Sequence, residues 1–517
     1  FTNNNGSGDL VAADFVLSVS GGTGTLSSAT PSKVTKSSNT YTLDFSLASI
    51  SNGSETIKVD LASNAVFDAA GNVAKATQTN NTSTLRDGRL QIAHEKSMYN
   101  SNSQYFTTLR DSRTGLYLTY FRRYYEDGYL FKHSINNDGS GFELKSNIRV
   151  SPNMKYGWSS MVKGPRDFYI TTDQGYNYEN SLWGGTIRTI QIREGTGGSV
   201  ILDNVSLNDI SNQNSGYYTN LVALNDSIYL AAYTSGSESG PGKLTSFRIN
   251  NNGKITRLFD YTHDANRSRW HKMAKVNDNT VVMAYEGYSG GYGGIIKTFT
   301  VSPKNGEITF LPGKKFTTST YNLEVDLIPL NENIFVLAYR GSGSDGFIET
   351  WSISKEGALT LKKQEEYDKD QGTWPSLMKT GPNTVFLAYS GVGSRGFIKS
   401  FDIPTDGSTI TENISFEHDD AQALYSELFQ IDSDTYGLTY YNKNGYAWMK
   451  LMNNLIATAE NMNPEISTVS LNSDNSKIAV TFNEPVYTAT GATTQPVAGD
   501  FALSMTGGTA TLSSATP

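Results

Sequence analysis

The 517-residue sequence contains no cysteine, which excludes disulfide bonds and thiolate metal sites. Charged residues make up only 18% of the chain and the net charge is −8, with no run of lysine or arginine to offset it. This balance argues against binding to the phosphate backbone of a nucleic acid. No apolar run approaches the roughly 20 residues that cross a bilayer. Glycine, at 48 residues, and tyrosine, at 30, are abundant, as is typical of an all-β protein with many turns.

A repeated pattern runs through most of the chain. In residues 331–353 and again in 382–401, a hydrophobic strand ends in Leu-Ala-Tyr, a Gly/Ser loop follows, and a glycine opens the next strand. The residue that closes the first strand recurs every 50 to 60 residues, at Tyr120, Asp173, Tyr233, Tyr285, Tyr339, Tyr389 and Tyr440. Each of these seven units has room for four short strands, which predicts a seven-bladed β-propeller over residues 86–457.

The two ends of this region predict how the propeller closes. The segment GRLQI at 88–92 matches the fourth-strand pattern GKITR at 253–257, whereas the seventh unit stops after its third strand, at 452–454. We therefore expect a strand at 88–96 to complete the last blade, which would leave no open sheet edge. This closure argues against the competing interpretation, a solenoid of β-hairpins.

The termini of the chain repeat one another. Residues 14–31 read DFVLSVSGGTGTLSSATP and residues 500–517 read DFALSMTGGTATLSSATP. Short alternating strands separated by turns are typical of an immunoglobulin-like sandwich. We expect 1–84 to be the C-terminal part of one such module and 461–517 the N-terminal part of the next. The predicted fold is all-β, a seven-bladed propeller flanked by two partial immunoglobulin-like β-sandwich modules, excerpted from a longer parent protein.

These patterns resemble a known family. The sandwich segments TFNEPV (481–486) and VFDAAGN (66–72) are similar to bacterial immunoglobulin-like repeats, and GFIKSFDIPTDGSTITENISFEHDD (396–420) is similar to repeats of the giant cell-surface adhesins of gliding Bacteroidota, the SprB type. The resemblance implies a non-enzymatic adhesin segment, exported by type IX secretion to the surface of a Gram-negative bacterium for gliding motility. Its implied partners are an external surface or polysaccharide, and the secretion and gliding machinery through other parts of the parent chain. Neither a nucleic acid nor a membrane span in this segment is implied.

Candidate ligand-binding residues also recur with the repeat. The positions 15 residues before each strand-closing residue are Tyr105, Trp158, Tyr218, Trp270, Glu324, Trp374 and Tyr425. Aromatic rings at the start of the innermost strands are suited to stacking on sugars, and many weak contacts would add up along a repetitive chain. The alternative is that these rings pack between blades and fill the neck of the central funnel. Longer loops add four candidates, Tyr176, Tyr178, Tyr288 and Tyr292.

Two other functions remain open. Glu324, with Asp326 beside it and Glu427 on another blade, could supply the acid and base of a polysaccharide-cleaving enzyme, which loss of product release in Glu324→Gln would reveal. A purely structural spacer is the other. No catalytic residue is predicted in the main interpretation, and the dipeptides His263-Asp264 and His418-Asp419 are predicted to anchor loops through hydrogen bonds.

The only cofactor that the sequence suggests is Ca²⁺. Asp68 and Asn72 flank a glycine turn, and Glu484 from the other sandwich segment could add a third hard oxygen ligand. The alternative is a turn without metal.

Overall fold

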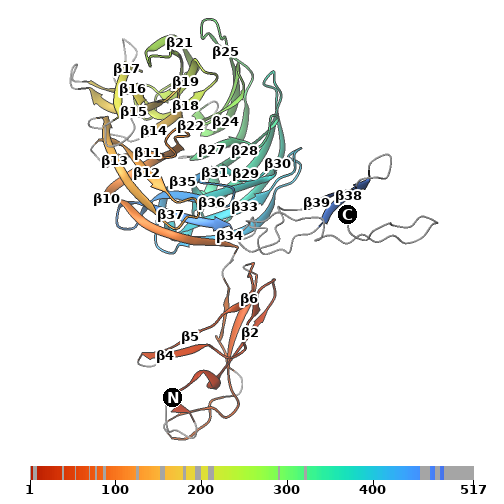
Figure 1. Cartoon of the computed structure of the whole chain (residues 1–517). Helices are drawn as coiled ribbons and strands as arrows, with labels where there is room; N and C mark the ends of the chain where they lie inside the picture. The colour runs from red at the N-terminus through yellow and green to blue at the C-terminus, as the bar shows by residue number, and fades with distance from the viewer. Residues whose placement is uncertain are drawn as a thin grey trace, which may run out of the picture. The chain divides into compact units, whose positions relative to one another are not determined.

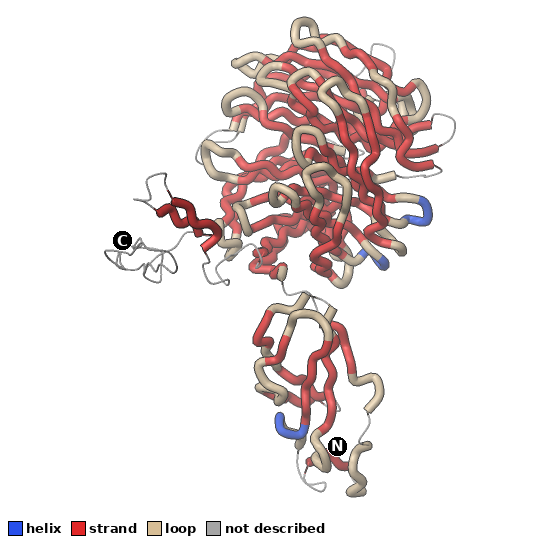
Figure 2. Tube along the Cα trace, turned by 90° about the vertical axis from the view of Figure 1, so that its right-hand side faces the viewer, coloured by secondary structure: helices blue, strands red, loops and turns tan. Residues whose placement is uncertain are grey.

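The structure is a computed structural model. It describes residues 2–3, 9–37, 40–52, 54–68, 70–75, 78–85, 89–123, 127–151, 158–177, 182–192, 199–207, 215–288, 292–318, 323–454, 466–471 and 478–482. The chain divides into two compact units, Phe1–Leu455 and Ile456–Pro517. In the described residues, helix is limited to three 3-10 turns, η1 (Ala12–Asp14), η2 (Ser342–Ser344) and η3 (Val392–Ser394), drawn blue in Figure 2. The same residues contain no helix with the length and apolarity that a membrane crossing requires.

The N-terminal segment forms small antiparallel sheets around its own core. Its strand pairs are β2 (Phe15–Ser20), β7 (Thr56–Leu61) and β9 (Thr82–Thr84) in one sheet, and β1 (Thr2–Asn3) with β8 (Val66–Phe67), β3 (Thr25–Leu26) with β6 (Leu47–Ser49) and β4 (Lys33–Ser37) with β5 (Thr40–Asp44). Leu10, Phe15 and Val66 are buried at its centre. In the unit Ile456–Pro517, the described residues form the antiparallel hairpin of β38 (Ile466–Leu471) and β39 (Ile478–Phe482).

Most of the chain folds into successive four-stranded antiparallel sheets. In chain order, their strands are β14 (Ser159–Lys163), β15 (Phe168–Asn177), β16 (Leu182–Gln191) and β17 (Val200–Ser206); β18 (Tyr217–Ala223), β19 (Ile228–Thr234), β20 (Gly242–Ile249) and β21 (Ile255–Asp264); β22 (Ser268–Asn277), β23 (Thr280–Tyr288), β24 (Tyr292–Val301) and β25 (Ile308–Phe310), with β26 (Lys314–Thr318) also on β24; β27 (Val325–Pro329), β28 (Ile334–Arg340), β29 (Gly346–Ile353) and β30 (Leu359–Asp368); and β31 (Thr373–Lys379), β32 (Thr384–Ser390), β33 (Gly396–Asp402) and β34 (Thr411–Asp419).

One long strand joins the beginning of this region to its end. β10 (Leu90–Arg110) pairs through residues 90–102 with β37 (Tyr446–Asn454), which continues the sheet of β35 (Ala423–Gln430) and β36 (Thr435–Asn442). Through residues 103–110 it pairs with β11 (Tyr117–Arg123), followed by β12 (Gly128–Ile135) and β13 (Phe142–Ser151). The sequence predicts a separate short strand at 88–96. The structure instead runs one strand through both sheets, with several bulges that bend it between them.

The first strands of the sheets meet in a closed circle. β10, β14, β18, β22, β27, β31 and β35 each contact the next, and β35 contacts β10 again. Figure 1 shows the sheets following one another around the body from β10 to β37. Four-stranded antiparallel sheets arranged around a common axis make a β-propeller, an architecture that protects its sheet edges.

The recurring tyrosine packs between neighbouring sheets. Tyr285, Tyr389 and Tyr440 are at most 1% exposed. Each phenol O–H donates to the aspartate that ends the preceding sheet: Tyr285 to Asp264 (3.2 Å), Tyr389 to Asp368 (2.9 Å) and Tyr440 to Asp419 (2.8 Å). The repeat period therefore reflects a contact between sheets, because a buried phenol needs a hydrogen-bond partner.

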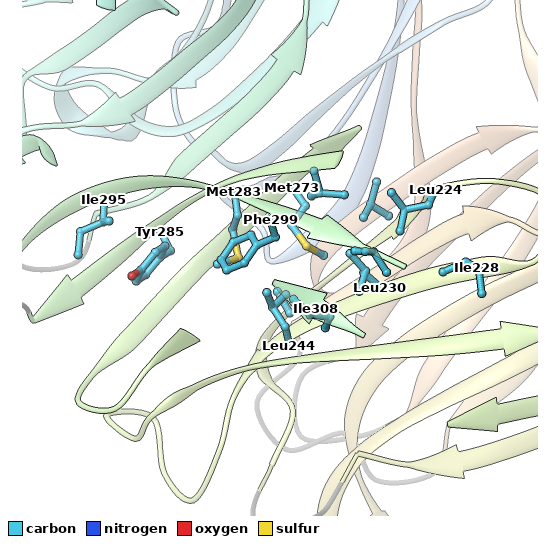
Figure 3. Close-up of a cluster of buried hydrophobic side chains, with 14 residues drawn as sticks. Leu224, Ile228, Leu230, Leu244, Met273, Met283, Tyr285, Ile295, Phe299 and Ile308 are labelled. Carbon is cyan, nitrogen blue, oxygen red and sulfur yellow. The ribbon is translucent and has the colours of Figure 1, made fainter. Parts of the chain in front are cut away.

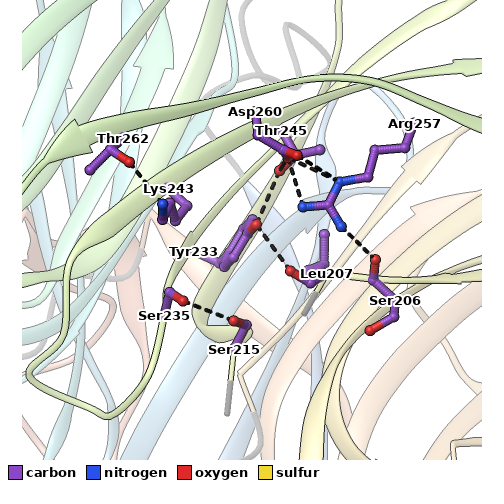
Figure 4. A network of polar contacts seen from close by, with 10 residues as sticks. All are labelled: Ser206, Leu207, Ser215, Tyr233, Ser235, Lys243, Thr245, Arg257, Asp260 and Thr262. Atoms are coloured by element: carbon purple, nitrogen blue, oxygen red, sulfur yellow. Dashed lines mark hydrogen bonds and ion pairs between the residues drawn. The ribbon is translucent and has the colours of Figure 1, made fainter. Parts of the chain in front are cut away.

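Apolar and polar contacts both join neighbouring sheets. Figure 3 shows Leu230 and Leu244 of one sheet packed against Met283 and Phe299 of the next, all fully buried. Burying one such side chain contributes about 1.5–3 kcal/mol. In Figure 4, Arg257 contacts Asp260 (2.7 Å) and donates to the Ser206 carbonyl of the preceding sheet (3.0 Å).

In the sheet of β31 to β34, the glycine that opens the third strand, Gly396, lies under the ring of His418 in the fourth strand. A Cβ added at Gly396 would lie 2.4 Å from two ring atoms of His418, which is 3% exposed. We expect Gly396→Ala to lower the free energy of unfolding by about 2 kcal/mol, since the packed ring cannot move away freely. Denaturant unfolding would measure this. Gly381→Ala is the matched control, because its nearest neighbour, Thr384, lies 3.6 Å away. Equal losses in the two variants would contradict this explanation.

Candidate active site

A cavity of about 490 Å³ lies among the first strands of the sheets, and we call it the axial cavity. It is lined by residues from β10, β14, β18, β22, β27, β31 and β35 and includes the seven positions predicted from the repeat. Its volume lies within the range of about 300–1,000 Å³ that is usual for small-ligand sites.

Aromatic side chains gather at this cavity because the strands bulge there. Tyr105, Tyr218, Trp270, Trp374 and Tyr425 all have positive φ, between 52° and 58°. Each lies within a register shift of its strand, as between Arg269 and Lys272. A bulge re-aims a side chain, and a bulky residue with left-handed backbone is a strained arrangement that must be held by its surroundings. The sequence repeat thus marks a repeated distortion of the innermost strands.

The rings contact one another. Trp158 and Tyr218 have centroids 4.0 Å apart, and Trp374 and Tyr425 4.2 Å. We call the complete set the aromatic circle: Tyr105, Trp158, Tyr218, Trp270, Trp374 and Tyr425. The structure therefore brings together all six predicted ring residues. Their mutual packing also agrees with the alternative in which they fill the neck of the funnel, and each ring contributes to lining the axial cavity.

Of the four tyrosines assigned to loops, Tyr288 has a described side chain, and it does not line this cavity. Tyr176 pairs with Trp183 and Tyr288 pairs with Tyr292, so these segments are extended hairpins, and their prediction as loops is wrong. Cross-strand pairing continues there because aromatic residues favour strands. Tyr288 is 45% exposed. Tyr178 lies outside the described residues.

Two residues beyond the aromatic circle, polar side chains connect five of the first strands to the next one. The Leu221 N–H donates to Ser160 Oγ (3.1 Å), and the Met273 N–H donates to Asn220 Oδ1 (2.9 Å). The same contact recurs from Leu377 to Asp326 Oδ2 (2.7 Å), from Leu428 to Ser376 Oγ (3.1 Å) and from Thr108 to Glu427 Oε1 (3.1 Å). These contacts satisfy buried backbone donors that the bulges would otherwise leave unpaired.

Lys272 occupies this position in its sheet but cannot accept a hydrogen bond. Its Nζ lies 3.2 Å from Asp326 Oδ1, and the Leu327 N–H that lacks a partner on β22 donates to that same oxygen (3.0 Å). The Lys272 side chain is 44% accessible, since it faces the hollow of the axial cavity. Sequence reasoning missed Lys272. The signal was a lysine where most other sheets place a hydrogen-bond acceptor.

Charges within the cavity shift one another's protonation. Burial raises the pKa of Glu427 to about 8, and the negative charge of Asp326 acts in the same direction, against the opposing effects of Lys272 and the Thr108 N–H. Burial alone would lower the pKa of Lys272, but Asp326 and Glu427 raise it above its usual value. Near neutral pH, the cavity therefore holds an ammonium group beside a carboxylic acid that keeps its proton.

Glu324 takes the place of the seventh aromatic residue. It is 5% exposed, and Oε1 lies 3.4 Å from Arg340 Nη1. Burial raises the pKa of Glu324 to about 7 in spite of Arg340. Of the three predicted carboxyl groups, Asp326 contacts Lys272, and Glu427 interacts electrostatically with both of them, whereas Glu324 lies at the level of the aromatic circle.

In the two His-Asp pairs, the aspartates make the predicted hydrogen bonds, whereas the rings of His263 and His418 have no hydrogen-bond partner among the described residues. His263 and His418 are at most 6% exposed, and burial lowers the pKa of His418 to about 3. Asp264 and Asp419 accept the phenol hydrogen bonds described above, and they also accept hydrogen bonds from N–H groups of the following turns. Neither pair lines the axial cavity.

In the turn predicted to bind calcium, both carboxylate oxygens of Asp68 already accept hydrogen bonds from the turn itself. Asp68 Oδ1 accepts the N–H groups of Ala70 (2.9 Å) and Asn72 (2.8 Å), and Oδ2 accepts the Asn72 amide (2.8 Å). Glu484 lies outside the described residues. Among those that are described, no group of three His, Cys, Asp or Glu side chains could hold a metal ion.

No protein-family model matches the chain, and no curated protein matches it. Among solved structures, it is similar to an ulvan lyase (TM-score 0.48, 10% identity, 70% of this chain and 96% of that chain covered). It is similar to the periplasmic gluconolactonase of Pseudomonas aeruginosa (0.45, 11%, 72% and 94%) and to the WD40 domain of Toxoplasma gondii coronin (0.44, 8%, 70% and 87%). Likeness at these identities concerns the fold alone.

These comparisons correct two predictions. The solved propellers that resemble the chain include a lactonase and a lyase rather than SprB-type adhesins, so the predicted adhesin relationship is wrong. The prediction of a non-enzymatic chain is corrected on the same finding. Adhesion, gliding and type IX secretion gain no support. The propeller pattern that carried them is a repeat consensus, which the contacts between sheets explain.

Proposed function

We propose that the chain is an enzyme that cleaves a polysaccharide in the axial cavity. The observation that carries this proposal is one cavity that holds a carboxylic acid with a raised pKa, Glu427, together with a hydrogen-bonded carboxylate, Asp326, and aromatic rings. Two carboxyl groups whose environments separate their protonation states are the usual acid and base of glycoside cleavage.

The two carboxyl groups exceed what the fold requires of them. Ser160, Asn220 and Ser376 make the same contact to the next strand with neutral side chains. Acidic groups at Asp326 and Glu427 are therefore unnecessary for joining the strands, and burying them is unfavourable unless they gain partners. A catalytic role explains why Asp326 and Glu427, rather than neutral side chains, occupy these positions.

Each group then has a defined step. Glu427 donates its proton to the glycosidic oxygen as the bond to the leaving sugar breaks. Asp326 accepts a proton from the water whose oxygen forms the new bond to the sugar carbon. Lys272 Nζ contacts Asp326 Oδ1 at 3.2 Å and holds that side chain in place, and the aromatic circle offers ring faces to the C–H surface of the sugar.

We propose the finer architecture as part of the same picture. Seven four-stranded sheets, the last completed by β10, would be seven blades, and the terminal segments would be parts of immunoglobulin-like modules. The closed circle of first strands and the repeated segments at 14–31 and 500–517 support this. An extracellular location is also proposed, because polymeric substrates do not cross membranes.

The proposal is tested by incubating the full chain with a panel of neutral and acidic plant and algal polysaccharides. Newly formed reducing ends would measure cleavage, and absorbance of unsaturated products would separate elimination from hydrolysis. We expect oligosaccharide release from at least one polymer, and its loss in Asp326→Asn. A folded chain that releases nothing from the panel, or equal release by Asp326→Asn, would overturn the proposal.

A further inference from the structure

Among the described residues that line the axial cavity, Ser426 Oγ is buried without a hydrogen-bond partner, and so are two atoms at neighbouring positions, the indole Nε1 of Trp270 and Oε2 of Glu324. Both residues line the cavity, and they occupy successive positions around its axis. A buried donor or acceptor without a partner costs about 1–3 kcal/mol, so two at one cavity call for an occupant.

Glu324 is held in a fixed position. Arg340 Nη1 contacts Oε1 at 3.4 Å, and Arg340 Nη2 donates to Ser344 Oγ (2.8 Å) in the turn η2. The carboxyl group is thus fixed through one oxygen and leaves the other unpaired. Trp270 is fixed by its neighbours, since its ring packs edge-on against Trp374 with centroids 5.3 Å apart.

We infer that Trp270 and Glu324 form a subsite that binds one hydroxyl group of a sugar. A hydroxyl both donates and accepts, so it can donate a hydrogen bond to Glu324 Oε2 while it accepts one from the Trp270 N–H. The ring faces of Trp270 and Trp374 offer an apolar surface beside it. A metal ion could bind the carboxylate but not the indole N–H, which is only a donor. A simple anion could accept the indole N–H but would be repelled by the carboxylate.

This inference names the substrate contact of the proposed enzyme and rests on that function only for the choice of a sugar. Acid–base chemistry is assigned to Asp326 and Glu427, which lie two residues beyond the aromatic circle and Glu324 in their strands. The subsite and the reaction can therefore be tested separately. An ordered water could make the same two hydrogen bonds, and the experiment must therefore distinguish water from sugar.

The test uses the ¹⁵N-labelled full chain, whose six tryptophans give six indole N–H resonances. Trp270→Phe identifies the Trp270 resonance. We titrate methyl glycosides of glucose, galactose and glucuronic acid. We expect at least one of them to shift the Trp270 resonance saturably, because the indole N–H gains an acceptor. The Trp351 resonance should stay in place, since its N–H already donates to buried Glu349 Oε2 at 2.7 Å.

Glu324→Gln supplies the second arm. At pH 8, above the pKa of about 7 that burial gives Glu324, glutamine keeps the volume but removes the charged acceptor, so the dissociation constant should rise about tenfold or more. Absence of a saturable shift with every glycoside would mean that water alone fills the subsite, and an unchanged dissociation constant in Glu324→Gln would exclude its carboxylate; either result overturns the inference. Saturable binding without polysaccharide cleavage would overturn the proposed function and leave the subsite standing.

Discussion

Replacing Glu427 by glutamine is expected to lower the cleavage rate about 100- to 10,000-fold, the usual contribution of a general acid. Glutamine has the same size and keeps an oxygen that can accept the Thr108 N–H, so the contact between β35 and β10 should survive. What is lost is the transferable proton. The measurement is initial product release at saturating polysaccharide, compared between wild type and Glu427→Gln.

The pH profile should identify the same group. Burial raises the pKa of Glu427 to about 8, so the acid form predominates below that pH and is lost as the pH rises through it. Wild-type activity should therefore decline above about pH 8. Glu412→Gln, an exposed surface change at a residue paired with Lys399 (2.8 Å), is the matched control and should leave rate and profile unchanged. A Glu427→Gln variant with wild-type activity would remove Glu427 from the mechanism.

Sequence periodicity predicted the aromatic circle because the structural reason for it repeats. A bulge with positive φ recurs in the first strands, and an aromatic side chain fills it, so counting back from the buried tyrosine finds these residues. The same logic explains why the strand-opening glycine and the tyrosine could be recognised. The glycine and the tyrosine both lie at contacts that recur from sheet to sheet, so the same residue is needed at the same place in the repeat.

The chemistry was harder to predict because it lies where the periodicity fails. Lys272 breaks a run of hydrogen-bond acceptors, and Glu324 breaks a run of aromatic rings. The repeat places residues 272, 326 and 427 at one level, two residues after the aromatic circle, and Asp326 and Glu427 could be named from it. A single sequence gives no distances between side chains, so the contact of Lys272 with Asp326 could not be inferred. The adhesin resemblance failed because it rests on repeated segments. Such segments reflect packing, and they do not indicate the role of the residues that depart from the repeat, such as Lys272 and Glu324.

The largest stability effect is expected away from the cavity, at Glu349 on β29. This side chain is fully buried and accepts hydrogen bonds from Tyr339 Oη (2.9 Å), Trp351 Nε1 (2.7 Å) and Gln364 Nε2 (2.8 Å). Glu349→Ala leaves at least two buried donors without an acceptor. At about 1–3 kcal/mol for each, it should lower the free energy of unfolding by about 3 kcal/mol or more. Denaturant unfolding at fixed pH measures this.

Glu349→Gln separates the charge from the hydrogen bonds. Burial raises the pKa of Glu349 from 4.5 to about 6, so between these values the folded chain binds more protons than the unfolded chain. The contribution of this group to stability is therefore fully present below pH 4.5 and is lost as the pH rises through about 6. The difference in unfolding free energy between wild type and Glu349→Gln should shift in favour of glutamine across that window and stay level above it. A difference independent of pH would mean that Glu349 ionises in the folded chain as easily as in the unfolded one, and that its three donors offset the whole effect of burial.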